Sequence, residues 1–286
     1  MNQLFEKYNP TRFGLISTRI LLILAIALGC CPFEMTGELE NVKTISFLSG
    51  IPAETLADPG VMYGLRAVLV VAALMWFFCL LVPVSCWLTA LAFAGLWALR
   101  LENSIFSPHI FHVAIMLTVI HAAWFTFYRR SIVYAYRSDQ TATTYNYPYW
   151  VYWLSVFYIG WFHTLAGIEK LRAHGWAWAD GTSLQLWTHA FGYHPSPVTQ
   201  WIVSNHQVAQ WLQQGTLVIE TAAILCILGR PFRWLVGLGL LGFYGGVLTS
   251  FVDYGFHLNA FLTAWFLLVA DFLLVAWRRP EAADLE

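Results

Sequence analysis

Residues 162–183 read FHTLAGIEKLRAHGWAWADGTS, and they join an apolar run to a segment rich in tryptophan. The apolar run ends at Lys170, and the Asp180-Gly181 pair predicts a turn. A lysine at the end of an apolar helix has two interpretations. It is either an interfacial anchor whose ammonium reaches water, or a base, because a desolvated ammonium gives up its proton more readily. Spacing alone favours the anchor, because lysines are common at the ends of membrane helices.

Small residues lie one helical turn before this lysine. Ala166 and Gly167 occupy those positions, and helical side chains lean toward the N-terminus, so Lys170 is predicted to lie over a notch. A flat ligand or another helix would fit there. Glu169 points to another side of the helix and is not an obvious partner for the lysine.

The composition is typical of an integral membrane protein. Hydrophobic residues make up 59% of the sequence and charged residues 11%, whereas charged residues are about 25% of ordinary soluble domains. The net charge of −1 and the lack of a basic patch argue against nucleic acid as a partner. The 15 tryptophans suit interfacial belts and flat hydrophobic ligands.

Eight apolar segments approach the length of about 20 residues that a bilayer-spanning helix needs. They cover roughly residues 15–33, 61–82, 83–99, 109–128, 149–168, 208–228, 232–250 and 257–277. We therefore predict an all-α integral membrane bundle of about eight transmembrane helices. It would form a single transmembrane domain over residues 1–286, without a soluble C-terminal domain. Residues 169–205, after the fifth helix, are predicted to form an amphipathic segment at the outer face.

Charge asymmetry predicts the orientation of these spans. The loops on the side of the N-terminus carry more lysine and arginine than the opposite loops, and such an excess marks the cytoplasmic side. We predict a multi-pass protein of a bacterial inner membrane with both termini cytoplasmic. Lys170 and most of the histidines would then lie near the external, periplasmic face.

Polar residues open two of the predicted spans at that face. His109 and His112 are one turn apart at the start of the fourth span, and His257 with Asn259 opens the last span. The first two are either functional groups, since ionisable residues in membranes are costly, or interfacial histidines in contact with water. We expect no metal, because no second carboxylate or cysteine stands at ligand spacing.

Two further polar residues lie within apolar segments. Glu220 is predicted to be a polar clamp between helices, because a buried carboxylate is costly unless it finds a partner. His163 lies two turns before Lys170 and is interpreted as a buried, hydrogen-bonded histidine.

The pattern around Lys170 resembles the horizontally transferred transmembrane domain, the membrane part of vitamin K-dependent gamma-glutamyl carboxylase and of bacterial relatives. The matching residues are Ala166, Gly167, Lys170, Leu171, Trp176 or Trp178, and Gly181. Further support comes from Glu220, the Arg230 and Arg233 loop, and the Phe256-His257-x-Asn259 helix start. The likeness covers most of the chain as a pattern of spans, and the Lys170 segment is its specific part.

This resemblance implies an enzyme of the carboxylase or epoxidase type, a lyase or monooxygenase, and it favours the base interpretation of Lys170. The base would act on reduced vitamin K or another quinol, with oxygen and carbon dioxide as co-substrates. His109, His112 and His257 are the further catalytic candidates implied. The cofactor-binding candidates are Ala166, Gly167, Trp176, Trp178 and Asn259.

The expected partners are the lipid bilayer, a quinone lipid and a secreted peptide substrate. The family's large luminal domain is not expected here, so the choice of substrate stays open. One alternative is a non-enzymatic membrane protein for the maturation of, or immunity to, a secreted peptide toxin. Another is a proton-coupled transporter that uses Glu220 and His121.

Overall fold

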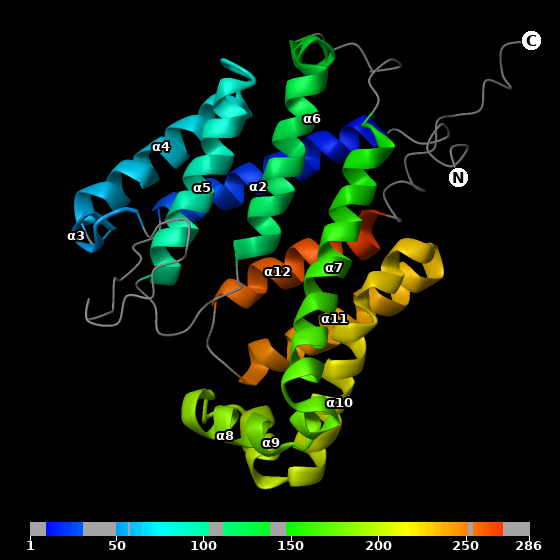
Figure 1. Cartoon of the computed structure of the whole chain (residues 1–286). Coiled ribbons are helices and arrows are strands. Elements are labelled where there is room, and N and C mark those ends of the chain that lie inside the picture. The colour runs from blue at the N-terminus through cyan, green and yellow to red at the C-terminus, as the bar shows by residue number, and fades with distance from the viewer. Residues whose placement is uncertain are drawn as a thin grey trace, which may run out of the picture. The chain divides into compact units, whose positions relative to one another are not determined.

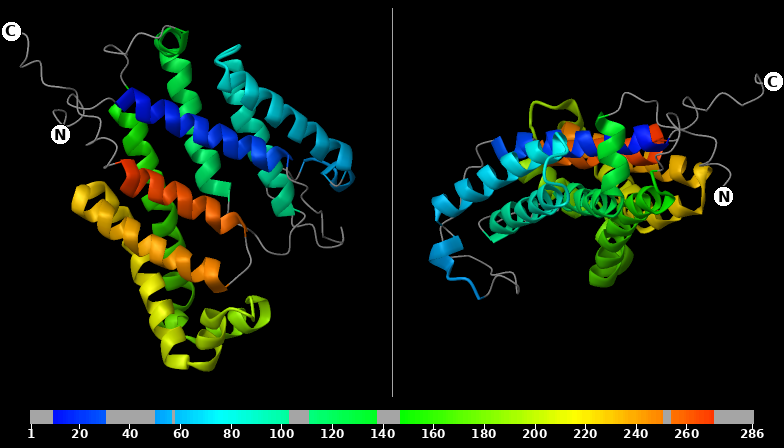
Figure 2. Two further views of the ribbon diagram at one scale, coloured as in Figure 1. Left: turned by 180° about the vertical axis from the view of Figure 1, so that it is seen from behind. Right: turned by 90° about the horizontal axis from the view of Figure 1, so that it is seen from above.

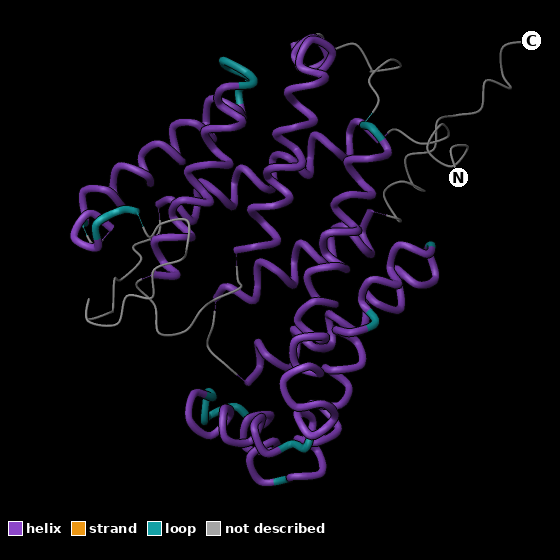
Figure 3. The backbone as a smooth tube through the Cα atoms, in the orientation of Figure 1, coloured by secondary structure: helices purple, strands orange, loops and turns teal. Residues whose placement is uncertain are grey.

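The computed structural model describes residues 10–30, 50–56, 58–102, 111–137, 147–250 and 254–270. Within these ranges the regular structure is helical and no strand is present (Figure 3). The all-α prediction is therefore confirmed. The chain divides into two compact units between residues 151 and 152, and the single transmembrane domain stays a prediction.

The first unit contains four long helices and one short one (Figure 1). The helices are α2 (Pro10–Cys30), α3 (Ala53–Leu56), α4 (Pro59–Phe77), α5 (Val84–Glu102) and α6 (His112–Arg137). In space, α2 packs against α4 and α6, and α5 packs against α4 and α6. At the start of α4, Asp58 accepts a hydrogen bond of 2.7 Å from the backbone of Gly60, an N-cap that satisfies an otherwise unpaired donor.

Aromatic side chains form the core of this first unit. The Trp76 and Phe125 rings meet edge to face at 5.3 Å, and Trp124 and Tyr147 do so at 4.9 Å. His121 is fully buried beside them, and its Nδ1 lies 2.7 Å from the carbonyl oxygen of Leu117. The histidine is therefore accommodated by a hydrogen bond to its own helix.

The second unit follows from α7 (Tyr149–His174), which begins just before the unit boundary. Its further helices are η3 (Gly175–Ala179), α8 (Thr182–Phe191), α9 (Pro197–Ser204), α10 (His206–Thr221), η4 (Ala223–Leu228), α11 (Arg230–Ser250), α12 (Tyr254–Ala264) and η5 (Trp265–Val269). The short α8 and α9 pack on each other and on α10 at one end of the unit, and α11 runs beside α12 (Figure 2).

Four helical segments of the described chain are long and apolar enough to cross a membrane, which indicates a membrane protein. They are Phe13–Cys30, Pro59–Phe77, Trp150–Ala179 and Arg230–Ser250. Shorter apolar helices lie at Val84–Leu99, His112–Tyr128 and Leu258–Val269. The count of about eight spans and the orientation of the chain stay predictions, and residues 1–9 and 271–286 lie outside the described residues.

The observed helix bounds differ from several of the predicted segments, and the fifth and sixth segments show this most clearly. The fifth helix continues to His174 instead of ending near residue 168, and the rest of residues 169–205 forms η3, α8 and α9. The sixth predicted segment, 208–228, is divided into α10 and η4. Its first part carries four glutamines, which make α10 less apolar than a typical span.

A threonine of α7 bonds to the backbone on both sides of the break between α10 and η4. The Thr164 hydroxyl accepts a 2.9 Å hydrogen bond from the Ile224 N–H and donates one of 3.3 Å to the Thr221 carbonyl oxygen. These backbone groups lie at a helix end, where intrahelical partners run out. The break is therefore satisfied by the neighbouring helix instead of by water.

Glycine lets α7 approach this region closely. A Cβ added at Gly160 would lie 2.7 Å from Cys226 Sγ and 2.9 Å from the Ala223 carbonyl oxygen. Both distances are shorter than carbon atoms tolerate in a close-packed interior, so the contact needs the absence of a side chain.

We expect Gly160→Ala to lower the free energy of unfolding by about 1–3 kcal/mol, because the added methyl overpacks the contact with η4. Gly215→Ala is the matched control: Gly215 lies in α10 with no atom within 4 Å of an added Cβ. That change should be neutral or stabilise by about 0.5–1 kcal/mol, because alanine favours helix. Thermal unfolding in detergent measures both, and equal midpoints for the two variants would contradict the close approach.

Candidate functional site

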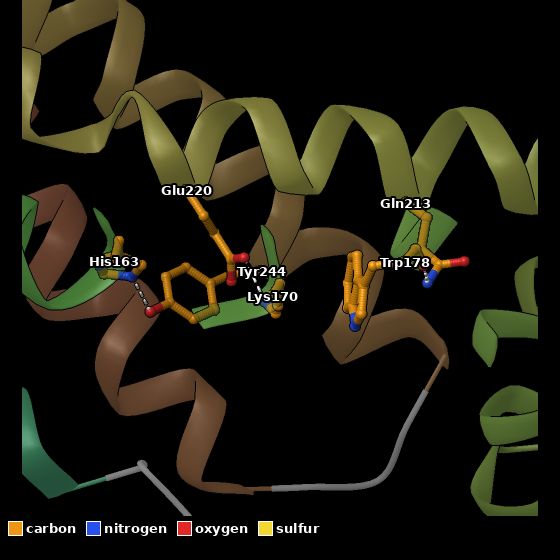
Figure 4. Close-up of polar contacts among 6 residues, drawn as sticks. All are labelled: His163, Lys170, Trp178, Gln213, Glu220 and Tyr244. Carbon is orange, nitrogen blue, oxygen red and sulfur yellow. Dashed lines mark hydrogen bonds and ion pairs between the residues drawn. The ribbon is translucent and has the colours of Figure 1, made fainter. Parts of the chain in front are cut away.

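An ion pair joins two helices of the second unit (Figure 4). The Lys170 ammonium, near the end of α7, donates a hydrogen bond to Oε2 of Glu220 at the end of α10. The Glu220 side chain is 5% exposed and the Lys170 side chain 25% exposed. Lys170 therefore contacts a buried carboxylate, and only part of its side chain is accessible.

Trp178 covers another side of the ammonium. Lys170 Nζ lies 4.9 Å from the centre of the Trp178 ring, within the range of a cation–π interaction. The other tryptophan that fits the sequence pattern, Trp176, is 64% exposed. The structure thus brings Trp178 to the lysine and leaves Trp176 at the surface.

A buried glutamine holds the segment that carries Trp178. The Gln213 amide donates hydrogen bonds to the Trp178 carbonyl oxygen (2.7 Å) and to Ser183 Oγ (2.6 Å), and its oxygen accepts one from the Gly181 N–H (2.9 Å). Gly181 has φ +95°, a left-handed conformation that glycine adopts readily. A Cβ there would also lie 2.7 Å from the Gln210 nitrogen. The turn is therefore fixed onto α10 and holds the backbone of Trp178.

A second hydrogen bond orients the opposite wall of the site. The Tyr244 hydroxyl lies 2.6 Å from His163 Nε2, and His163 Nδ1 lies 2.7 Å from the Ile159 carbonyl oxygen. Because a carbonyl only accepts, Nδ1 carries the proton and Nε2 accepts from Tyr244. Figure 4 shows the Tyr244 ring beside Glu220, with its hydroxyl directed to His163. His163 therefore acts as the hydrogen-bonded, buried histidine that the sequence suggested.

The predicted notch before Lys170 is filled by protein. A Cβ at Gly167 would lie 2.6 Å from the Thr221 nitrogen, so the end of α10 occupies that position. Ala166 is half-buried beside it. Of the two possible occupants of the notch, the structure places another helix there.

The remaining sequence candidates are His109, His112, His257 and Asn259. His109 is outside the described residues, and His257 lies in α12 with its side chain outside the described part. His112 belongs to the first unit, where its ring is 4.2 Å from the Trp97 ring. Asn259 is buried in α12 near the Tyr244 hydroxyl, together with Thr263. Within the described residues, no group of three or more His, Cys, Asp or Glu could hold a metal ion.

Gln213 was not singled out from the sequence, and Glu220 was predicted as a polar clamp between helices without being assigned to the Lys170 site. Glu220 is 50 residues from Lys170 in the chain, so no local spacing links them. The available signal was one carboxylate inside an apolar segment and one lysine at the end of another. A buried charge needs a partner, and each was the obvious partner of the other.

Comparison with known proteins found no matching family model, no matching curated protein and no matching solved structure. The function is therefore argued from the site itself and from the sequence pattern around Lys170.

We expect Gln213→Leu to destabilise the protein and displace Trp178, because it leaves the Trp178 carbonyl and the Gly181 N–H without their partner. Each buried polar group left unpaired costs about 1–3 kcal/mol. Gln214→Leu is the matched control, since this neighbouring half-buried glutamine takes no part in the three hydrogen bonds. Thermal unfolding in detergent compares the two, and an equally small change in both would contradict the role of Gln213.

Proposed function

We propose that the chain is a membrane enzyme that binds a quinol-like lipid beside Lys170 and removes a proton from its hydroxyl group. This step would begin oxygen-dependent carboxylation, or a related modification, of a peptide substrate at the outer membrane face. The observation that carries the proposal is the setting of the Lys170 ammonium, which lies between a buried carboxylate and the face of an indole while part of the side chain stays exposed.

The chemistry of a quinol suits this setting. A quinol is flat and aromatic, so it can stack on Trp178 or a neighbouring aromatic ring. Its hydroxyl is a weak acid, and a positive charge nearby stabilises the anion that forms when the proton leaves. The ion pair occurs in an apolar bundle with membrane-spanning helices, where a lipid-soluble substrate is at hand.

The sequence pattern suggests which reaction would follow removal of the quinol proton. The Ala166-Gly167-x-x-Lys170-Leu171 pattern resembles that of the vitamin K-dependent carboxylase, in which a lysine acts on reduced vitamin K. When bound, reduced vitamin K or another quinol would supply the oxygen-dependent base chemistry, with oxygen and carbon dioxide as co-substrates. This chain would supply the base, the charge that stabilises the ligand anion and the apolar enclosure.

The test is oxygen-dependent conversion of a reduced naphthoquinone to its epoxide by the purified protein in detergent. We expect Lys170→Met to lose about 10²–10⁴-fold in rate, the range over which a positioned acid or base contributes. Arg172→Met is the matched control and should keep full activity, because the Arg172 side chain is 74% exposed and pairs with the exposed Glu169.

Full epoxide formation by a folded Lys170→Met protein would remove Lys170 from the chemistry. The absence of epoxide from the wild-type protein, with quinol delivery and folding verified, would favour the non-enzymatic alternative. That alternative predicts binding of a secreted peptide that survives the loss of Lys170.

A further inference from the structure

The Lys170 ammonium is already protonated, so it is not a base by itself. It already donates to Glu220 Oε2, and an ammonium has three N–H donors and no lone pair. It can take a proton from a ligand only after it has released one. The group in contact with it that can receive that proton is the Glu220 carboxylate.

We infer that Glu220 is the proton acceptor of this site and that Lys170 relays the ligand proton to it, so that the two side chains act together as one base. The inference rests on the proposed function, because it concerns the proton of a hydroxyl ligand bound at Lys170. It changes the role of the lysine from an independent base to a relay that stays positively charged.

The different exposure of the Lys170 and Glu220 side chains sets the direction in which the proton moves. The Lys170 side chain is 25% exposed and that of Glu220 only 5% exposed. A ligand that reaches the site therefore meets the ammonium first, and the carboxylate lies behind it. A proton that leaves the ligand moves inward, from the accessible group to the buried one.

The two ionisable side chains beside the pair, His163 and Tyr244, are already hydrogen-bonded. On α7, both ring nitrogens of His163 are hydrogen-bonded, to the Ile159 carbonyl oxygen and to Tyr244. On α11, the Tyr244 hydroxyl is directed at His163 and away from Glu220 (Figure 4). Within the described part of the chain, His163 interacts electrostatically with Lys170, and Tyr244 with Glu220.

Among the described residues, the remaining neighbours carry no charge. Trp178 from η3 presents its ring face to the ammonium, and Gln213 on α10 holds the Trp178 backbone. From α12, Asn259 and Thr263 lie near the Tyr244 hydroxyl. Among the described residues of the site, Glu220 is thus the base in direct contact with Lys170.

The step balances in atoms and charge. The ligand O–H bond breaks, and its proton forms a new N–H bond on Lys170 Nζ. The proton in the Lys170–Glu220 hydrogen bond moves to Oε2, which turns the carboxylate into a carboxylic acid. The pair changes from neutral to +1 while the ligand changes from neutral to −1. A neutral lysine beside an ionised Glu220 would instead leave a buried carboxylate without its counter-charge, which is unfavourable.

Binding of 2-hydroxy-1,4-naphthoquinone tests this without turnover. This coloured probe is an anion at neutral pH, so Glu220 must gain a proton from the medium when the probe binds. We expect wild-type protein in weakly buffered detergent to take up about one proton per bound probe. The probe affinity should rise about tenfold for each unit by which the pH falls, and an infrared difference spectrum should gain a carboxylic acid band.

Three variants identify the residue that takes up the proton when the probe binds. Glu220→Gln should bind the probe without proton uptake and without the pH dependence of affinity, whereas Glu220→Asp should keep both. Glu169→Gln is the control for a nearby carboxylate, since its side chain is 68% exposed, and it should take up the proton as the wild type does. The infrared band of the wild-type protein gives the answer even if a Glu220 variant does not fold.

The outcomes separate this inference from the proposed function. If the wild type binds the probe without proton uptake and without a new acid band, Glu220 is not the acceptor, while the site at Lys170 stands. If folded wild-type protein does not bind the probe, the quinol site is wrong and the inference falls with it.

Discussion

The Lys170–Glu220 ion pair, set in an apolar helical environment, constrains what can surround it in the second unit. Removing Lys170 and Glu220 from water costs several kcal/mol per ion, and their attraction recovers that cost only in good geometry. Apolar residues of similar size would stabilise such a bundle at least as well. A pair with a buried carboxylate and an ammonium side chain that is 25% exposed is therefore better explained by chemistry than by stability. The function proposed here follows from that reasoning.

The surroundings of the pair hold it in place through backbone and ring contacts. Trp178 lies over the ammonium, and its carbonyl is bound by Gln213. Tyr244 lies beside the carboxylate and is fixed by His163. Each wall is thus oriented by a second buried polar group whose own hydrogen bonds are satisfied. Such support keeps a charged site preorganised, which lowers the reorganisation needed during reaction.

The sequence was sufficient for the helices and for one half of the site. The apolar segment 61–82 predicted a helix, because a helix satisfies its own backbone inside a membrane, and the structure has a helix at Pro59–Phe77. The Ala166-Gly167 pair predicted a close approach next to Lys170. The sequence could not show that Thr221 fills the notch or that Glu220 contacts the lysine, because those contacts depend on how distant helices are rotated and paired. The division of residues 208–228 also depended on a distant residue, the Thr164 hydroxyl of α7.

Helix α10 fixes the spacing between two residues that support the site. Gln213 and Glu220 are seven positions apart on it, which is close to two helical turns and about 10.5 Å along the axis. Gln213 binds the backbone of Trp178, and Glu220 binds the Lys170 ammonium. The helix repeat therefore sets the distance between these two points of attachment. Inserting a single residue between them would turn one about 100° away from the other. Related chains with this site should therefore vary in loop lengths while keeping the spacing of these two positions.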